Sequence, residues 1–247
     1  MEELMPDRAR RLARLLVVAL HCSRWAPAVG GTRPRRRRRE PPPDPATLLR
    51  QAADRMEQVQ SFHYVLDHER GVSPIVLGLT MSRAEGDAVR PDKLRADVDA
   101  AAFGGVNLKL KLVSIGAKTS ITNPFDPSKW QELPTGTKLS DVFDPANGTT
   151  AALRNVKNPV LAGEETINGV KVWRVEGTVD AAALGALATV AETGYTAKTT
   201  AWIGQNTPNL HRVRLEGQLG TRDTADVVRR LELSRFDESI TITAPPS

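Results

Sequence analysis

The stretch LRADVDAAAFGGVNLKLKL, residues 94–112, decides the fold class of this chain. Apolar and polar side chains alternate along both of its halves, and the pair Gly104-Gly105 stands between them. A period of two is typical of a β-strand with one buried face, and a Gly-Gly pair favours a tight hairpin turn. The stretch therefore predicts an antiparallel ribbon with one apolar and one polar face.

Similar β-rich segments follow and precede this ribbon. Asn168-Gly169 is the signal of a type I′ hairpin turn. The Pro-containing pairs from Asn123-Pro124 to Asn158-Pro159 favour turns, so loops are expected around Trp130. The other predicted strands span 61–69, 75–83, 160–167, 170–179, 195–204, 210–219 and 227–236. This gives about ten strands, joined mostly by tight turns.

Two main helices accompany the strands. Asp44 followed by Pro45 is an N-cap with proline at the first helical position, and apolar residues at helical spacing predict a helix as far as Gln60. Asp180 is expected to cap a nearly all-apolar helix over 181–192, and a short helix is expected over 146–154. The fold class is therefore α+β: an antiparallel sheet that curls, with helices covering its apolar face and room between them for an apolar ligand.

Composition and charge exclude several classes of protein. The 247 residues contain one cysteine and 4% aromatics, which excludes collagen-like and disulfide-rich chains and implies a core of Leu, Val, Ile and Ala. The net charge is +5, but residues 1–45 hold 11 arginines against five acids. The remaining 23 bases and 24 acids make the body neutral, which argues against a nucleic-acid-binding domain.

Residues 1–28 have the pattern of a secretory leader. Four arginines precede the short apolar run 15–20, and Cys22, the single cysteine, follows that run after His21. In a bacterial lipoprotein such a cysteine is diacylated and becomes the mature N-terminus. His21 departs from the usual small residue before it. The alternatives are ordinary signal cleavage at Ala26-Pro27-Ala28, which leaves a secreted protein, and a basic amphipathic helix that is not a signal.

Residues 29–45 are predicted to be a solvated tether, because they are rich in arginine and proline and cannot bury apolar surface. Its arginines either adhere to anionic lipid headgroups or only keep the spacer solvated. They are Arg33, Arg35, Arg36, Arg37, Arg38 and Arg39. The predicted organisation is thus a leader over 1–28, a tether over 29–45 and a single domain over 46–247.

Patterns typical of catalysis are poor in this sequence. P-loop, G-x-S-x-G, H-E-x-x-H and G-x-G-x-x-G motifs do not occur. His68 lies between Asp67 and Glu69, but neighbouring residues of a strand point to opposite faces, so the three are expected on an exposed polar strand rather than around a metal. Glu164-Glu165 is expected to solvate a sheet edge. We therefore predict a protein that is not an enzyme and needs no metal or cofactor.

Several motifs in order resemble the LppX/LprAFG family of lipid-carrying lipoproteins from mycobacteria and other bacteria with complex envelopes. They are LLRQAADRMEQVQSFHYVL (48–66), RPDKLRADVDA (90–100), SITNPFDPSKWQEL (120–133), DPANGTTAAL (144–153), GEETINGVKVWRVEGTVDAAAL (163–184) and TAWIG (200–204). The resemblance implies a half-barrel sheet with helices on its concave side, similar in shape to the LolA and LolB carriers. It also implies a cavity for acyl chains and a role in carrying lipids or lipoglycans between membranes.

The expected function is that of a monomeric lipid carrier on the extracytoplasmic face of the cell membrane, anchored through Cys22. The rival classes are a cell-surface module that binds a partner protein and, further off, an esterase. The alternation of the strands leaves open which apolar residues line a cavity and which pack the core. The proposed lining residues are Val98, Leu108, Leu110, Leu112, Val175, Leu184, Leu187, Val213, Leu215, Leu231 and Leu233.

Overall fold

A computed structural model describes residues 42–102, 104–133, 148–187 and 191–246 of the chain. The expected leader with Cys22 and the arginines of the tether lie outside these residues, so both remain predictions. Among the described helices, none has the length and apolar character needed to cross a bilayer.

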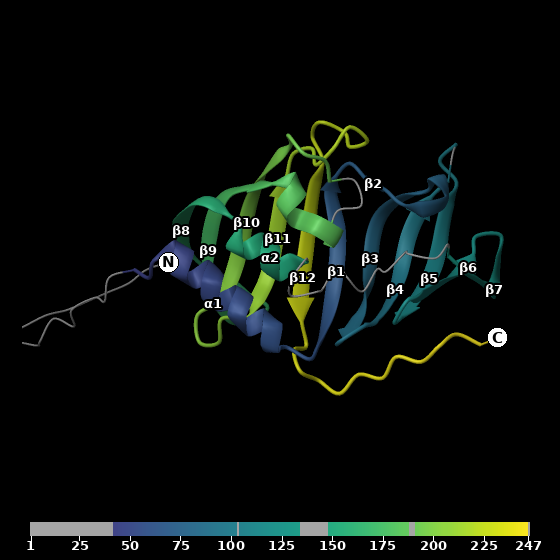
Figure 1. The fold of residues 1–247 in the computed structure, drawn as a ribbon, viewed down its shortest axis with the longest axis horizontal. Coiled ribbons are helices and arrows are strands. Elements are labelled where there is room, and N and C mark those ends of the chain that lie inside the picture. Colours follow the sequence, from purple (N-terminus) through teal and green to yellow (C-terminus); the bar gives the residue numbers. More distant parts are fainter. Residues whose placement is uncertain (1–41, 103, 134–147, 188–190, 247) are drawn as a thin grey trace, which may run out of the picture. The chain divides into compact units, whose positions relative to one another are not determined.

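Twelve strands form one sheet, and the pairings between the described strands are antiparallel. Their spatial order is β7-β6-β5-β4-β3-β1-β12-β11-β10-β9-β8, and β2 pairs with β3 beside this path (Figure 1). The sheet is open, with β7 and β8 at its two ends. The strands are β1 (Ser61–Arg70), β2 (Ser73–Pro74), β3 (Thr80–Val89), β4 (Lys93–Ala101), β5 (Asn107–Ile115), β6 (Lys118–Asn123), β7 (Asp126–Glu132), β8 (Lys157–Ile167), β9 (Val170–Asp180), β10 (Thr196–Gly204), β11 (Leu210–Glu216) and β12 (Val228–Ser234).

Helix α1 (Pro45–Gln58) begins where the sequence predicts. Asp44 is its N-cap, and the Asp44 carboxylate accepts a hydrogen bond of 2.8 Å from the Thr47 N–H. The helix contacts β8, β10 and β11 and also the short helix α2 (Thr149–Arg154), which in turn contacts the 3₁₀ helix η3 (Ala181–Leu187). Figure 1 shows α1 and α2 in front of the half of the sheet formed by β8–β12.

The predicted hairpins are confirmed by the backbone. Gly104 and Gly105 both adopt positive φ in the turn between β4 and β5, as do Asn168 and Gly169 between β8 and β9. Positive φ at both central residues is the requirement of a type I′ turn, which Asn-Gly meets with little strain. The ribbon that residues 94–112 predict is therefore β4 and β5, paired from Lys93 opposite Ile115 to Ala101 opposite Asn107.

Three predicted segments need correction. The strand expected over 75–83 begins only at Thr80, because Leu77 and Gly78 adopt positive φ in a turn (η1, Val76–Gly78) that the Ile75 N–H closes onto the Leu79 carbonyl. Trp130 lies in β7, not in a loop: β7 ends the sheet, and an edge strand tolerates Pro127 without loss of a ladder hydrogen bond.

The third correction concerns the helix expected over 181–192. Within this predicted range, residues 181–187 form a 3₁₀ helix, and the described residues 191–192 are not helical. Asp180 belongs to β9, and its carboxylate accepts hydrogen bonds from Lys157 and Thr196 instead of capping the helix. The short helix expected over 146–154 starts at Thr149 in the structure, and residues 146–147 lie outside the described part of the chain.

Candidate functional site

One face of the sheet carries an unbroken apolar row across nine neighbouring strands. Each residue of the row stands directly opposite the next, and all nine belong to one apolar cluster. Because side chains alternate between faces along a strand, opposite residues in such a ladder share one face. From β5 to β8 the row is Leu110, Val98, Ala84, Leu66, Leu231, Val213, Ala201, Val175 and Leu161.

Small residues occupy part of this apolar face, and at Gly86 the backbone of β4 approaches too closely for a side chain. A second row runs from Tyr64 across Gly86 and Ala96 to Leu112 and Ile121. The Tyr64 hydroxyl donates a hydrogen bond of 3.2 Å to the Arg95 carbonyl on β4, so the tyrosine side chain crosses β3, where Gly86 has no side chain. Burial raises the pKa of Tyr64, which keeps its hydroxyl protonated as a donor.

Helix α1 turns its apolar side to the same cluster. Leu48, Leu49, Ala52, Ala53 and Met56 of α1 are buried in it together with strand residues of the row. The opposite side of α1 carries charged residues, as expected of an amphipathic helix on a sheet. Helix α1 therefore packs as a second layer on the apolar face, over the half of the sheet that contains β8–β11.

The proposed lining residues are found mainly in this cluster. Val98, Leu110, Leu112, Val175, Leu231 and Leu233 are buried in it, and Leu108 and Val213 pack against it while partly exposed. Leu184 lies in a second cluster under η3, with Leu215 packed against it. The side chain of Leu187 is outside the described part. Which of these residues would contact a ligand stays a prediction.

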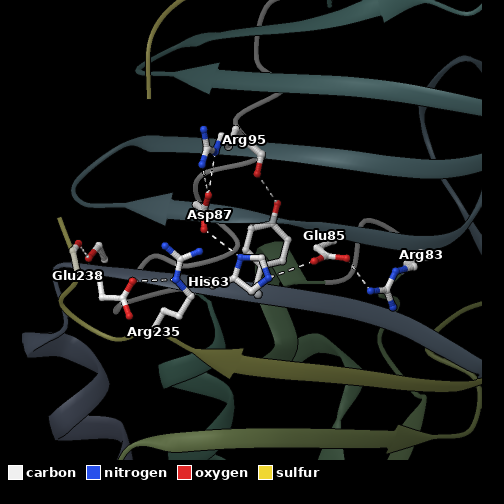
Figure 2. Close-up of polar contacts among 9 residues, drawn as sticks. His63, Arg83, Glu85, Asp87, Arg95, Arg235 and Glu238 are labelled. Atoms are coloured by element: carbon white, nitrogen blue, oxygen red, sulfur yellow. Dashed lines mark hydrogen bonds and ion pairs between the residues drawn. The ribbon is translucent and has the colours of Figure 1, made fainter. Parts of the chain in front are cut away.

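Charged pairs occupy the other face of the sheet. His63 Nδ1 donates to Asp87 Oδ1 over 2.9 Å, and Arg95 donates from Nε and Nη2 to Asp87 Oδ2 (Figure 2). Burial acts to raise the pKa of Asp87, but the hydrogen bonds from His63 and Arg95 outweigh it and hold the pKa below its usual value.

The described residues contain no group of three or more His, Cys, Asp and Glu side chains that could hold a metal ion.

The two acidic motifs of the sequence are now placed. Glu165 lies on the edge strand β8, where it pairs with Arg174 over 2.6 Å and accepts from Trp202 Nε1, while Glu164 accepts from Gln205. Asp67 and Glu69 project to the charged face, toward Arg230 and Arg214. His68 was expected on an exposed polar strand, but its side chain is half-buried on the apolar side, because it follows Tyr64 and Leu66 in the alternation of β1.

A polar group interrupts the apolar face where β12 begins. Arg229 stands opposite both His68 of β1 and Leu215 of β11, which places it on the apolar side of the sheet. Its Nη2 pairs with Asp223 Oδ1 at 2.5 Å, and its Nε donates to Ser73 Oγ over 2.9 Å. His68 Nε2 lies 2.7 Å from the same hydroxyl, and burial lowers the pKa of His68.

Sequence reasoning missed this group, although the strand pattern contained its signal. In β12 the apolar positions are 229, 231 and 233, so the first of them is an arginine where Leu231 and Leu233 predict an apolar residue. A charge at an inward position of an amphipathic strand marks a buried pair or a binding site. Leu66, Ala84, Ala201 and Leu161 of the long row were also missed, because their strands alternate less regularly.

Comparison with known proteins supports one family. Residues 44–242 match the family model described as LppX_LprAFG lipoprotein. The chain is 28% identical over 206 residues to the lipoarabinomannan carrier protein LprG of Mycolicibacterium smegmatis, which covers 82% of this chain and 83% of that protein.

Two crystal structures share the fold. LprF from Mycobacterium bovis aligns with a TM-score of 0.66 at 18% identity, covering 84% of this chain and 99% of that one. LppX from Mycobacterium tuberculosis aligns with a TM-score of 0.58 at 21% identity, covering 80% of this chain and 97% of that one. At these identities the likeness concerns the fold alone.

Proposed function

The chain belongs to the LppX/LprAFG lipoprotein family, and from this premise we propose that it carries acylated lipids or lipoglycans between layers of the cell envelope. It acts on the extracytoplasmic side and is held at the membrane by lipidation of Cys22. The name of the LprG relative, a lipoarabinomannan carrier, supports a lipoglycan or a similar acylated lipid as the ligand class.

The observation that carries this proposal is the apolar row of nine residues, one on each of nine neighbouring strands. Acyl chains gain about 0.8 kcal/mol for each CH₂ that they bury, so two chains of C16 size bind tightly without any polar contact. The face also carries the small residues Ala84, Gly86 and Ala96, and the Tyr64 side chain crosses β3 at Gly86. The sheet then acts as a half-barrel whose helices cover the concave side, with the proposed lining residues around the acyl chains.

Such a site works without a chemical step. Binding through chain burial is tolerant of the headgroup, so specificity is loose. Release follows from movement of the helices that cover the apolar face or from docking on an acceptor. These properties separate the carrier from an esterase, which must position a nucleophile at an ester, and from a surface module that binds only protein.

Native mass spectrometry of the full chain, purified from the envelope of a membrane-bearing host, tests the proposal. A carrier retains lipid, which appears as added mass that organic extraction removes. An esterase hydrolyses a p-nitrophenyl ester instead. A protein-binding module does neither, and a lipid-free chain that captures no added diacylglycerol would rule the carrier out.

Leu110→Trp locates the bound lipid. Leu110 lies in the apolar row and is 1% exposed, so an indole there fills space that a ligand or the core uses. We expect the fraction of chain with bound lipid to fall at least about fivefold, a change of about 1 kcal/mol. Lys111→Trp, one residue further and on the opposite face, is the matched control and should retain lipid.

Circular dichroism decides whether the Leu110 variant is folded, and Leu215→Trp repeats the test at a half-buried position that accepts bulk more easily. If both tryptophan variants fold and carry as much lipid as the parent, these two residues do not line the site.

A further inference from the structure

Arg229 is the buried cation of the apolar face. Its side chain is 9% exposed, and that of its partner Asp223 is fully buried. Along β12 it precedes Leu231 of the apolar row by one alternation, and across the sheet it faces Leu215, which packs on the cluster under η3. The guanidinium therefore lies at the border between the two apolar clusters, at the opposite end of β1 and β12 from the end of α1.

The hydrogen bonds around Arg229 form a closed set with one exception. Arg229 Nε donates to Ser73 Oγ, the Ser73 hydroxyl donates to His68 Nε2, and His68 Nδ1 donates to the Ser82 carbonyl over 2.9 Å. Asp223 accepts from Arg229 Nη2 at Oδ1 and from the Leu219 N–H at Oδ2. Within this group Arg229 Nη1 is the one donor that is buried without a hydrogen-bond partner; the other such nitrogens among the described residues belong to Arg174, Arg212 and Arg230.

An unpaired buried donor destabilises the folded chain, and the cost is larger on a charged group. Native structures rarely leave one without a role. Nη1 lies on the edge of the planar guanidinium away from Nε–H, so its two hydrogens point away from Ser73. The guanidinium is thus held by Ser73 and Asp223, and Nη1 has no acceptor among the described residues.

The charges of the group indicate which acceptor fits. Asp223 balances the guanidinium, and the hydrogen-bond pattern of His68, with Nδ1 donating and Nε2 accepting, is that of the neutral imidazole. A phosphate entering here would meet no net positive charge and would lie near the Asp223 carboxylate. A neutral carbonyl oxygen meets a charge-assisted donor without this repulsion.

We propose that Arg229 Nη1 binds the ester carbonyl of an acylated lipid, where the acyl chain joins the head of the molecule. This inference rests on the proposed carrier function and adds a position for the ligand. The acyl chain then extends from Arg229 to the apolar row, which it meets at Leu231. Arg229 sets how deeply the acyl chain enters, and this contact does not recognise the headgroup.

Competition between an ester and an ether lipid tests the inference. The full chain, freed of lipid, is offered 1,2-dipalmitoylglycerol and its dihexadecyl ether analogue in equal amounts, and native mass spectrometry measures the bound ratio. Because a hydrogen bond to a charged donor contributes about 1.5–3 kcal/mol, we expect the ester to be favoured at least about tenfold.

The double variant Arg229→Met with Asp223→Asn removes both charges and retains an amide oxygen for the Leu219 N–H. It should bind both lipids about equally. Arg230→Met is the matched control, because Arg230 is the next residue but pairs with Asp67 on the charged face. Its ester preference should equal that of the parent.

Each other result has a definite meaning. A parent chain that binds ester and ether equally overturns the inference and leaves the carrier function intact, whereas a chain that binds neither contradicts the carrier function itself. If the double variant still prefers the ester lipid, the ester is recognised elsewhere, and the inference about Arg229 is also overturned. Stronger binding of dipalmitoyl phosphatidate than of the diacylglycerol, lost in the double variant, would assign a phosphate to Nη1 instead.

Discussion

Asp87 is a carboxylate with a side chain only 5% exposed, yet it lies among polar partners on the charged face of the sheet. His63 and Arg95 each donate to one of its oxygens, as Figure 2 shows, and together they favour its ionised form. Arg95 is itself half-exposed, so water still reaches one side of the group. The pairing joins β1, β3 and β4, which are neighbours at the centre of the sheet.

Asp87→Asn should lower the free energy of unfolding by about 1–3 kcal/mol at pH 7, because the variant weakens hydrogen bonds to a buried charge. The pKa of the Asp87 carboxyl is lowered in the folded chain from its ordinary value, so its contribution to stability is present above that ordinary value and is lost as the pH falls through the folded-state pKa. Urea unfolding at several pH values should show the deficit at pH 7 and its closure below about pH 4.

Glu85→Gln is the control for this prediction, since Glu85 also contacts His63 but has a side chain that is 47% exposed. Its effect should be smaller and should vanish in high salt. A deficit of Asp87→Asn that stays constant from pH 7 to strongly acidic pH would show that lost packing, not charge, causes it.

At the scale of elements, ion pairs join α1 to α2. Arg154 at the end of α2 donates to Asp54 over 2.8 Å and to Glu57 over 2.5 Å, both on α1. These three side chains are partly exposed, and ion pairs of this kind contribute about 0.2–1 kcal/mol.

Arg154→Gln should therefore accelerate lipid exchange up to about fivefold while the thermal stability changes little. Transfer of a fluorescent acyl lipid from the chain to vesicles measures the rate. Salt should accelerate the parent more than the variant. Lys109→Gln removes an exposed ion pair between Lys109 of β5 and Asp99 of β4 and should exchange at the parent rate. Equal rates in all three proteins would mean that release does not involve the α1–α2 contact.

Local signals of the sequence predicted the elements where they dominate the energetics. The Asp44-Pro45 cap and the Gly-Gly and Asn-Gly turns each define backbone conformation within a few residues, and the structure confirms all of them. Strand β7 and helix η3 depend on tertiary partners: an edge position admits Pro127, and β9 extends to Asp180 because it pairs with β10 as far as Thr196.

For the candidate site, the sequence predicts the apolar face of several strands but not the polar group on that face. Alternation identified the apolar face of β4, β5, β11 and β12, because a period of two assigns each side chain to a face. It could not identify the Arg229 group, since Asp223, Ser73 and His68 come from a loop and two other strands that only the folded sheet brings together.

At the scale of the whole molecule, charge is divided between the body and the tail. Residues 46–247 carry 23 bases and 24 acids, and on the sheet many of them pair across strands, as Arg212 does with Glu232 and Arg230 with Asp67. The basic excess lies in residues 1–45. Attraction to a membrane surface is therefore expected from the tail, whereas the described domain supplies the apolar face.

Cys22→Ala separates the two ways in which this tail can hold the chain at a membrane. Cys22 is the single cysteine, it follows the apolar run of the leader, and the family is one of lipoproteins, whereas His21 is bulky for a lipoprotein cleavage site. A thioether diacylglycerol with an N-acyl chain gives stable anchoring, whereas arginine adhesion is screened by salt. The variant should move from the membrane fraction, washed with about 1 M salt, to the soluble extracytoplasmic fraction and still bind lipid. Ser23→Ala should fractionate like the parent. If Cys22→Ala also does so, the anchor is not Cys22, and cleavage after Ala28 or a retained leader explains the location better.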